Sequence, residues 1–366
     1  MPKTVLLCRV DGNFGGVEKT ILSIARHLDP TRYTPVVVPI GTQGELARQA
    51  KASGISVAPL PMPSRLAVWP AQAALGQIAG RHEAALIHTF GIRSNTLALL
   101  TTRRLGLPWI IRVPNINCTD YTNPLHGWLA HAFNNALLRR ASAVQVISPQ
   151  LVQYLSQLRK PPRRIDFIPN GVDVSQFSPD DDQTTTDTVV IGSTGRLEPI
   201  KGYDLLIEAF ATIHAHYPSA QLVLVGNGSQ EAVLRDLARQ LQIETHVHFS
   251  GYMADVCPAL AQFTLFVCSS HSEGVPNALL EAMAMGLPII STQVGGISSI
   301  LSEREAVLIP PGDPRALADA MLCLLGESER RWRLGQAARA RAEAEFSVQS
   351  MVNRVMQMYD EVIQNS

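Results

Sequence analysis

The chain has 366 residues, 46% of them hydrophobic and 17% charged, and its 31 Lys and Arg balance its 31 Asp and Glu. This composition speaks against an intrinsically disordered chain, and the length predicts two domains, because single hydrophobic cores stop growing at about 250–300 residues. The five cysteines are scattered without a Cys-x-x-Cys pair, which argues against a zinc site or a disulfide framework and is typical of buried cytosolic thiols.

The first residues, MPKTVLLCRV, are typical of a β-strand rather than of a secretory signal, because the apolar run is short and Arg9 and Asp11 follow it closely. Nowhere does an apolar stretch approach the roughly 20 residues of a membrane-spanning helix, so we expect a cytoplasmic protein. Apolar runs alternate with helical periodicity through the first half, which predicts parallel strands covered on both faces. The strands expected there are residues 4–10, 34–40, 55–60, 84–89, 108–113, 142–148 and 164–169.

The segment 181–187 is acidic and threonine-rich without an apolar period, and we interpret it as a linker. The alternating pattern then restarts, so residues 1–180 and 188–345 are expected to be two doubly wound domains facing a cleft. Ligands of open parallel sheets bind beyond the carboxyl ends of the strands, so the loops there are candidate sites. The strands expected in the second half are residues 188–194, 221–227, 246–251, 263–270, 288–293 and 306–310.

The balanced total charge hides a split between the two halves. Residues 1–180 hold 19 Lys and Arg against 9 Asp and Glu, and residues 181–366 hold 12 against 22. A basic half predicts an anionic partner such as a membrane surface, a phosphorylated lipid or nucleic acid, although a solvated arginine-rich surface would look the same. Nucleic acid is not expected, because few aromatic residues lie among the basic clusters. These clusters are Arg103–Arg104, Arg139–Arg140, Arg159–Lys160 and Arg163–Arg164.

Two loops after predicted strands could receive an anionic ligand. Gly15 and Gly16 precede a helix, where backbone N–H groups attract negative charge, but their spacing matches neither a dinucleotide fingerprint nor a P-loop. Glu18 has an ordinary interpretation, as an acid that complements the helix macrodipole. In the segment GRLEPIKG, Arg196 and Lys201 suit a diphosphate, although two surface cations before a helix would give the same pattern.

Two carboxylates stand eight positions apart in the segment SSHSEGVPNALLEAMAMGLP. Glu273 falls on a turn after a strand, and Glu281 falls inside an apolar helix, where a carboxylate is costly unless it is hydrogen-bonded. Two adjacent sugar or ribose hydroxyls would satisfy Glu281, and so would a neighbouring cation. The N–H groups from Gly274 to Ala278 can point at a phosphate or a sugar oxygen.

Taken together, these loops resemble the retaining glycosyltransferases of the GT-B fold, family four, which use nucleotide sugars. The resemblance rests on GGVE at 15–18, IPNGVD at 168–173, GRLEPIKG at 195–202 and EGVPNALLEAMAMGLP at 273–288. It implies an α/β architecture of two Rossmann-like domains, of which the first binds the acceptor and the second the nucleotide sugar. It also implies that a last helix, residues 346–366, crosses back onto the N-terminal domain.

The resemblance assigns roles to individual residues. It implies that Arg196 and Lys201 hold the diphosphate leaving group, that Glu281 binds ribose hydroxyls and that Glu273 contacts the transferred sugar. Neither a cofactor nor a metal is required by this mechanism, in which the acceptor enters on the face that the leaving phosphate vacates. The remaining donor-binding residues implied are Gly15, Gly16, Gly228, Tyr252, Met253, Gly274, Val275, Asn277 and Ala278.

The acceptor side departs from the family pattern. His88 matches a common family histidine, but Phe90 replaces the second one, and the region after the strand 108–113 has Asn115 and Asn117 where another histidine is usual. We expect His88 and Asn115 to line the acceptor side, although a satisfied histidine at a strand end is an equally good interpretation of His88.

The sequence therefore predicts a hexosyltransferase that moves a sugar, most commonly from a UDP donor in this family, to a glycan or lipid-diphosphate acceptor at the inner face of a membrane. Its product would belong to a surface polysaccharide, lipopolysaccharide or other glycolipid. The alternatives are a nucleotide-sugar epimerase of the same fold, which needs no acceptor, and a non-catalytic sugar-nucleotide-binding relative, which would be expected to lose Arg196, Lys201 or Glu273.

Overall fold

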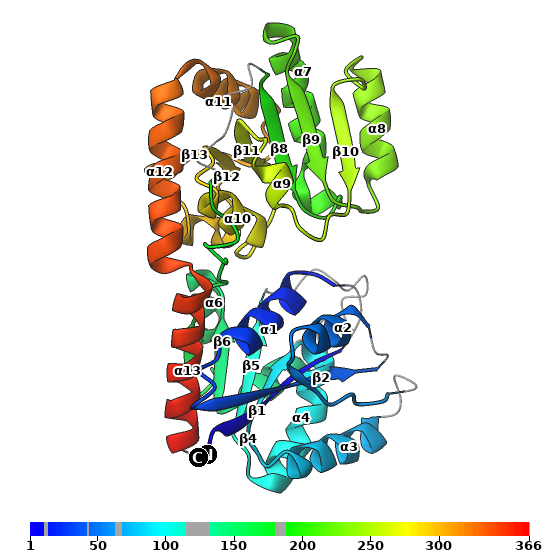
Figure 1. The fold of residues 1–366 in the computed structure, drawn as a ribbon, viewed down its shortest axis with the longest axis vertical. Helices are drawn as coiled ribbons and strands as arrows, with labels where there is room; N and C mark the ends of the chain where they lie inside the picture. The colour runs from blue at the N-terminus through cyan, green and yellow to red at the C-terminus, as the bar shows by residue number, and fades with distance from the viewer. Residues whose placement is uncertain (11–13, 42–43, 63–67, 115–131, 180–187, 366) are drawn as a thin grey trace. The chain divides into compact units, whose positions relative to one another are not determined.

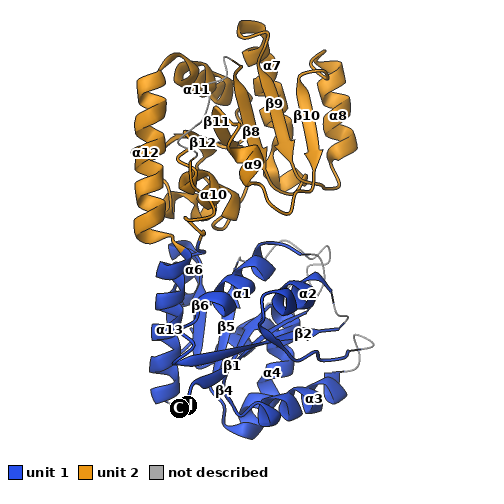
Figure 2. Cartoon of the chain, viewed as in Figure 1, with its two compact units in different colours: residues 1–171, 348–366 blue, residues 172–347 orange. Residues whose placement is uncertain are grey.

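The computed structural model describes residues 1–10, 14–41, 44–62, 68–114, 132–179 and 188–365. The chain forms two compact units (Figure 2): unit 1 contains residues 1–171 and 348–366, and unit 2 contains residues 172–347. The linker expected at 181–187 lies outside the described residues.

Unit 1 is built on a seven-stranded parallel sheet in the order β3-β2-β1-β4-β5-β6-β7 (Figure 1). The strands are β1 Lys3–Val10, β2 Tyr33–Ile40, β3 Ser56–Val57, β4 Ala84–Phe90, β5 Trp109–Val113, β6 Ala143–Val146 and β7 Ile165–Phe167. Residues 132–138 are helical, and the labelled helices are α1 Gly16–His27, α2 Glu45–Ala52, α3 Val68–Arg81, α4 Ile92–Leu105, α6 Pro149–Ser156 and α13 Val348–Gln364.

The last helix of the chain, α13, completes the core of unit 1. Its buried side chains, among them Val352, Val355 and Tyr359, pack in one cluster with Leu7 of β1 and Ile21 of α1. This position confirms that the C-terminal helix returns to the N-terminal domain. The helix begins at Val348, two residues after the start predicted from the sequence at residue 346.

Unit 2 repeats the architecture with a six-stranded parallel sheet in the order β10-β9-β8-β11-β12-β13. Its core joins apolar residues of the sheet to α7, α8 and α11. The strands are β8 Val190–Thr194, β9 Gln221–Val225, β10 Val247–Gly251, β11 Leu265–Cys268, β12 Ile289–Thr292 and β13 Ala306–Ile309. The helices are η1 Pro199–Lys201, α7 Tyr203–His216, α8 Glu231–Gln240, α9 Cys257–Leu260, α10 Asn277–Ala284, η2 Gly295–Ser299, α11 Pro314–Gly326 and α12 Ser328–Glu345.

Both sheets confirm the predicted α/β class, and every strand expected from the sequence forms. In each sheet the strand order reverses between the first and fourth strands of the unit, β1 and β4 in unit 1 and β8 and β11 in unit 2. Loops diverge at such a point beyond the carboxyl ends of the strands, and ligands of doubly wound sheets bind there. The fold therefore directs attention to the loops after β1, β4, β8 and β11.

Candidate functional site

The loop after β8 carries the two cations singled out from the sequence. Arg196 is exposed and makes no ion pair with any residue that the structure describes. Lys201 ends the 3-10 helix η1, and its side chain is 19% exposed. Gly202 then takes a left-handed conformation (φ 60°) and caps α7. The loop thus presents one open cation and one sheltered cation at the carboxyl edge of the sheet.

Lys201 forms an ion pair with Glu273 of the loop after β11. The same carboxylate oxygen of Glu273 accepts a hydrogen bond from the Ser270 hydroxyl (3.0 Å), and the Glu273 side chain is 12% exposed. Two residues that lie 72 positions apart in the sequence are therefore brought together at the reversal point of the sheet. Ser270 was not singled out from the sequence, since a serine at a strand end carries no signal of its own.

Hydrogen bonds to backbone carbonyls hold the loops after β8 and β11 together. The Ser269 hydroxyl donates to the Lys201 carbonyl (3.1 Å), and the His271 N–H donates to the Ile200 carbonyl (2.8 Å). A Cβ at Gly202 would collide with the Ser269 carbonyl, so the close approach of the loops depends on glycine there. The geometry of Lys201 and Glu273 is consequently set by the fold rather than by the ion pair alone.

A third loop, after β12, supports Glu273 from the other side. The Gly296 N–H donates to the Glu273 carbonyl (3.1 Å), and Gly295 has a left-handed φ of 51°. A Cβ at Gly295 would overlap the Glu273 carbonyl oxygen. Glu273 is thus held by its side chain and by its backbone, an arrangement that pre-positions a carboxylate for a ligand.

Helix α10 begins at this edge and contains Glu281. It starts at Asn277 after Pro276, without a side-chain cap, so its positive dipole end faces the same edge. Glu281 is 7% exposed among apolar side chains of the helix. Gly274 and Ala278 are half-buried, and Val275 is buried at the turn. The structure therefore brings the residues 273–281 and Lys201 to one end of the sheet.

The loops after β9 and β10 carry the residues assigned to the nucleobase side. Gly228 lies against the Leu197 backbone, where a Cβ would collide, and the Leu197 N–H donates to the Asn227 carbonyl (2.9 Å). Tyr252 is 58% exposed and Met253 is half-buried. Gly228 thus joins the Arg196 loop directly, whereas Tyr252 and Met253 follow β10 at the edge of the sheet.

In unit 1, the glycine loop is fixed by two charged residues. The buried Glu18 carboxylate accepts a hydrogen bond from the Gly15 N–H (3.0 Å) and an ion-paired hydrogen bond from Arg9 (2.8 Å). Arg9 also donates to the Phe90 carbonyl at the end of β4 (2.9 Å). Glu18 therefore does more than complement a dipole: with Arg9 it ties the loops after β1 and β4 together. Arg9 was overlooked in the sequence, although a cation near the end of an apolar strand was a usable signal.

His88 lies inside unit 1, fully buried, with its Nδ1 2.8 Å from the Tyr359 hydroxyl of α13 and its ring stacked on Phe90. Burial, reinforced by the positive charge of the nearby Arg112, holds the pKa of His88 well below its usual value. Burial also lowers the pKa of Arg112 to about 10. Asn115, the other acceptor-side prediction, lies outside the described residues.

The chain matches two families of known proteins. The family described as "Glycosyl transferases group 1" matches residues 175–341, and the family described as "Glycosyl transferase 4-like domain" matches residues 15–171. The two matches nearly coincide with unit 2 and with the first segment of unit 1.

Among curated proteins, a GDP-mannose-dependent phosphatidylinositol monomannoside mannosyltransferase of Corynebacterium glutamicum is 34% identical over 52% of this chain and 54% of its own length. N-acetyl-alpha-D-glucosaminyl L-malate synthase of Bacillus anthracis is 27% identical over 80% of this chain and 78% of its own length. The chain thus spans about half the length of the first of these relatives and about three quarters of the second.

Among solved structures, HepE of Anabaena in complex with UDP has a TM-score of 0.86 at 21% identity, covering 98% of this chain and 100% of that one. Sucrose-phosphate synthase of Thermosynechococcus elongatus has a TM-score of 0.82 at 20% identity over the full length of both chains. At these identities the likeness establishes the fold.

Proposed function

The chain belongs to the GT-B glycosyltransferases, with a group 1 domain and a 4-like domain, and on this premise we propose that it transfers a sugar, with retention, from a nucleoside diphosphate donor to a glycan or lipid-linked acceptor. The observation that carries the proposal is the ion pair of Lys201 and Glu273 at the reversal point of the second sheet. A cation for a diphosphate and a carboxylate for sugar hydroxyls are held there side by side.

The arrangement assigns a role to each group. The diphosphate lies against Arg196 and Lys201, which stabilise the negative charge that develops on it as it leaves. As the diphosphate engages Lys201, the Glu273 carboxylate is released from its partner and accepts hydrogen bonds from the transferred sugar. The start of α10 faces the same anionic ligand, and Glu281 receives the ribose hydroxyls.

The proposed reaction is a front-face substitution at the anomeric carbon. The bond from that carbon to the phosphate oxygen breaks, and a bond from the acceptor hydroxyl oxygen forms on the same face. The acceptor proton passes to the departing phosphate, so the protein need not supply a general acid. The paired carboxylates that flank the scissile bond in glycosidases thus have no counterpart in Glu273 and Glu281, which act as ligands of the donor.

The donor and acceptor classes rest on the relatives. HepE is bound to UDP, and the Corynebacterium enzyme is named for GDP-mannose and for a phosphatidylinositol acceptor. A relative from Rhizobium meliloti is named for lipopolysaccharide core biosynthesis. We propose a UDP-sugar donor and a surface glycan or glycolipid product made at the inner face of a membrane. In the part of the chain that the structure describes, no helix is long and apolar enough to cross a bilayer.

A thermal-shift screen against UDP, GDP, ADP and their common sugar conjugates tests the donor site. One diphosphate should raise the melting temperature, because a ligand that binds the folded state stabilises it by mass action. Glu281→Ala should reduce the shift by removing the ribose ligand, and Arg196→Ala should reduce it by removing a diphosphate contact. The absence of a shift with every nucleotide would contradict the proposal. Release of an altered sugar without an acceptor would point to an epimerase instead.

A further inference from the structure

One surface of unit 1 gathers positive charge that the donor site does not use. Residues 81–164 contain eleven Lys and Arg but only two Asp and Glu. Seven of these cations lie in the three connections that lead into β5, β6 and β7, and we call them the basic edge. They are Arg103, Arg104, Arg139, Arg140, Arg159, Lys160 and Arg163.

The three connections meet at the amino ends of the strands, because helices of a doubly wound sheet run back from the carboxyl edge to the amino edge. Hydrogen bonds join the segments there: the Ser142 N–H donates to the Trp109 carbonyl (2.8 Å), and the Val144 N–H donates to the Arg164 carbonyl (2.9 Å). The basic edge is therefore continuous across neighbouring strands. It lies at the opposite end of the strands from Gly15 and Phe90.

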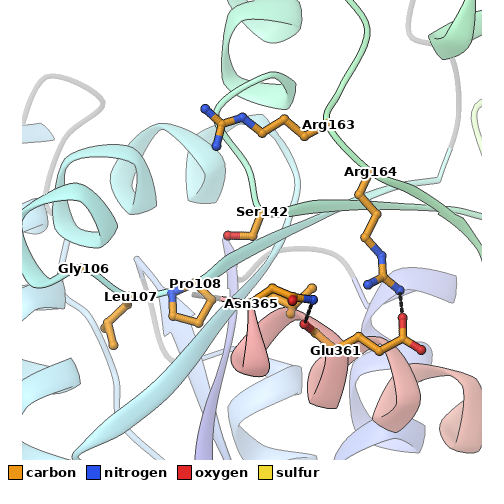
Figure 3. Close-up of a pocket in the computed structure, with 9 residues that line it drawn as sticks. Gly106, Leu107, Pro108, Ser142, Arg163, Arg164, Glu361 and Asn365 are labelled. Atoms are coloured by element: carbon orange, nitrogen blue, oxygen red, sulfur yellow. Dashed lines mark hydrogen bonds and ion pairs between the residues drawn. The ribbon is translucent and has the colours of Figure 1, made fainter.

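A hollow of about 380 Å³ opens within this edge (Figure 3). Arg164 turns toward Glu361 of α13 and also binds Asp166, whereas the Arg163 side chain turns away from that ion pair. Arg164 is thus neutralised by its neighbours, and Arg163 is left for a ligand of the hollow. The residues that line it are Gly106, Leu107, Pro108, Ser142, Arg163, Arg164, Glu361, Val362 and Asn365.

The cations of the basic edge lack acidic partners. Within the described ranges, none of the seven forms an ion pair, and all except Arg139 are exposed. Arg139 and Arg140 each donate to a carbonyl of their own helix, four residues earlier. Among the described residues, no hydrogen bond of this kind is made by the other five cations, Arg103, Arg104, Arg159, Lys160 and Arg163.

Compensation of helix macrodipoles is the ordinary explanation for cations at helix carboxyl ends. Unit 2 provides an internal control, because it has the same architecture and the same helix directions. Its helices α10, α11 and α12 have no basic residue in their last turns, and the arginine in the last turn of α8, Arg239, is paired with Asp236. The fold itself therefore does not require a row of unpaired cations at this edge.

We propose that the basic edge binds the surface of an anionic phospholipid bilayer, with a lipid phosphate seated beside Arg163. This inference rests on the proposed function, in which the product is made at a membrane surface. Leu105, which is 44% exposed between Arg104 and Gly106, adds an apolar side chain for the headgroup region. Nucleic acid fits the edge less well, because no aromatic residue lies within two positions in the sequence of any of the seven cations, where a base could stack beside them.

Sedimentation with sucrose-loaded vesicles tests the proposal on the full chain. Wild type should bind vesicles of phosphatidylcholine with 30% phosphatidylglycerol, but not vesicles of phosphatidylcholine alone, and binding should weaken from about 50 to about 300 mM NaCl. A variant carrying Arg103→Gln, Arg104→Gln and Arg163→Gln should lose binding by about 100-fold, since each cation near an anionic surface contributes roughly fivefold.

The matched control is a variant with Arg235→Gln, Arg239→Gln and Arg330→Gln, which removes three exposed arginines of unit 2 and should bind vesicles like wild type. Both variants should keep the thermal shift with the donor nucleotide, so that failure of membrane binding is distinguished from failure of the donor site. Equal loss in the two variants, or no binding of wild type to anionic vesicles at low salt, would overturn the proposal. If wild type bound nucleic acid but not anionic vesicles, the basic edge would be a nucleic-acid-binding surface and the membrane proposal would be wrong.

Discussion

The two units share one topology but differ in the sign of their charge and in the edge of the sheet at which unpaired cations gather. Unit 1 has 20 Lys and Arg against 9 Asp and Glu, and unit 2 has 11 against 22. In unit 2 the carboxyl edge is tightly joined, with Lys201, Glu273 and Gly295 held by several loops. In unit 1 the unpaired cations lie at the amino edge. A shared fold thus fixes where loops can meet, whereas side chains decide what each edge of the sheet can bind.

The largest effect should come from the carboxyl edge of the sheet in unit 2, where Lys201 and Glu273 lie. Lys201→Ala removes the sheltered cation that stabilises the leaving diphosphate, and we expect kcat to fall by about 100–1000-fold, the range seen when one preorganised electrostatic group is lost. Turnover of the donor found in the thermal-shift screen measures this. The control is Arg304→Ala, an exposed cation of the same unit, which should keep full activity. Undiminished turnover in Lys201→Ala would remove the leaving-group assignment.

A smaller but still large effect should come from the packing of that edge. Gly295→Ala places a Cβ against the Glu273 carbonyl at a left-handed φ, and we expect unfolding free energy to fall by about 3 kcal/mol. Gly312→Ala is the matched control, because Gly312 also has a left-handed φ (77°) but no neighbour where its Cβ would lie. It should cost only about 1 kcal/mol. Urea unfolding compares the two, and equal losses would show that backbone strain alone matters.

The smallest effect concerns the buried polar residues of unit 1. Burial and the charge of Arg112 lower the pKa of His88 in the folded state. As the pH falls, the imidazole is therefore protonated in the unfolded chain while it stays neutral in the folded chain. Stability should therefore fall as pH drops below about 6.5, by about 1.4 kcal/mol at pH 5.5 relative to pH 7.5. The other polar groups facing His88 are Gln145 and Tyr359, and burial raises the pKa of the Tyr359 hydroxyl.

Urea unfolding at the two pH values measures this difference. In His88→Gln the difference in unfolding free energy between the two pH values should shrink by about that amount, because glutamine does not titrate in this range. This holds whatever stability the substitution itself removes at pH 7.5. Tryptophan fluorescence follows unit 1 through Trp109, which is buried in β5, whereas Trp332 of unit 2 is 66% exposed and should change less on unfolding. An unchanged pH dependence in the variant would show that other groups cause it.

Local patterns in the sequence predicted the strands and the α/β class, because burial on both faces of a parallel sheet leaves a continuous apolar run in the sequence. The candidate loops were found because glycine, cations and acids follow these runs. The pairing of Lys201 with Glu273 and the burial of His88 beneath α13 could not be predicted, since each depends on residues far apart in the chain. The ligand roles of the named site residues stay predictions.

The place of α13 in the core of unit 1 has a consequence for synthesis on the ribosome. Unit 2 is one continuous segment, 172–347, and is synthesised before α13. The first segment of unit 1 precedes unit 2, yet Val352, Val355 and Tyr359 of its core emerge only after unit 2. Domains usually fold in order from the N-terminus. Here the core of unit 1 stays incomplete, and the surface that α13 covers stays open, until α13 has been synthesised.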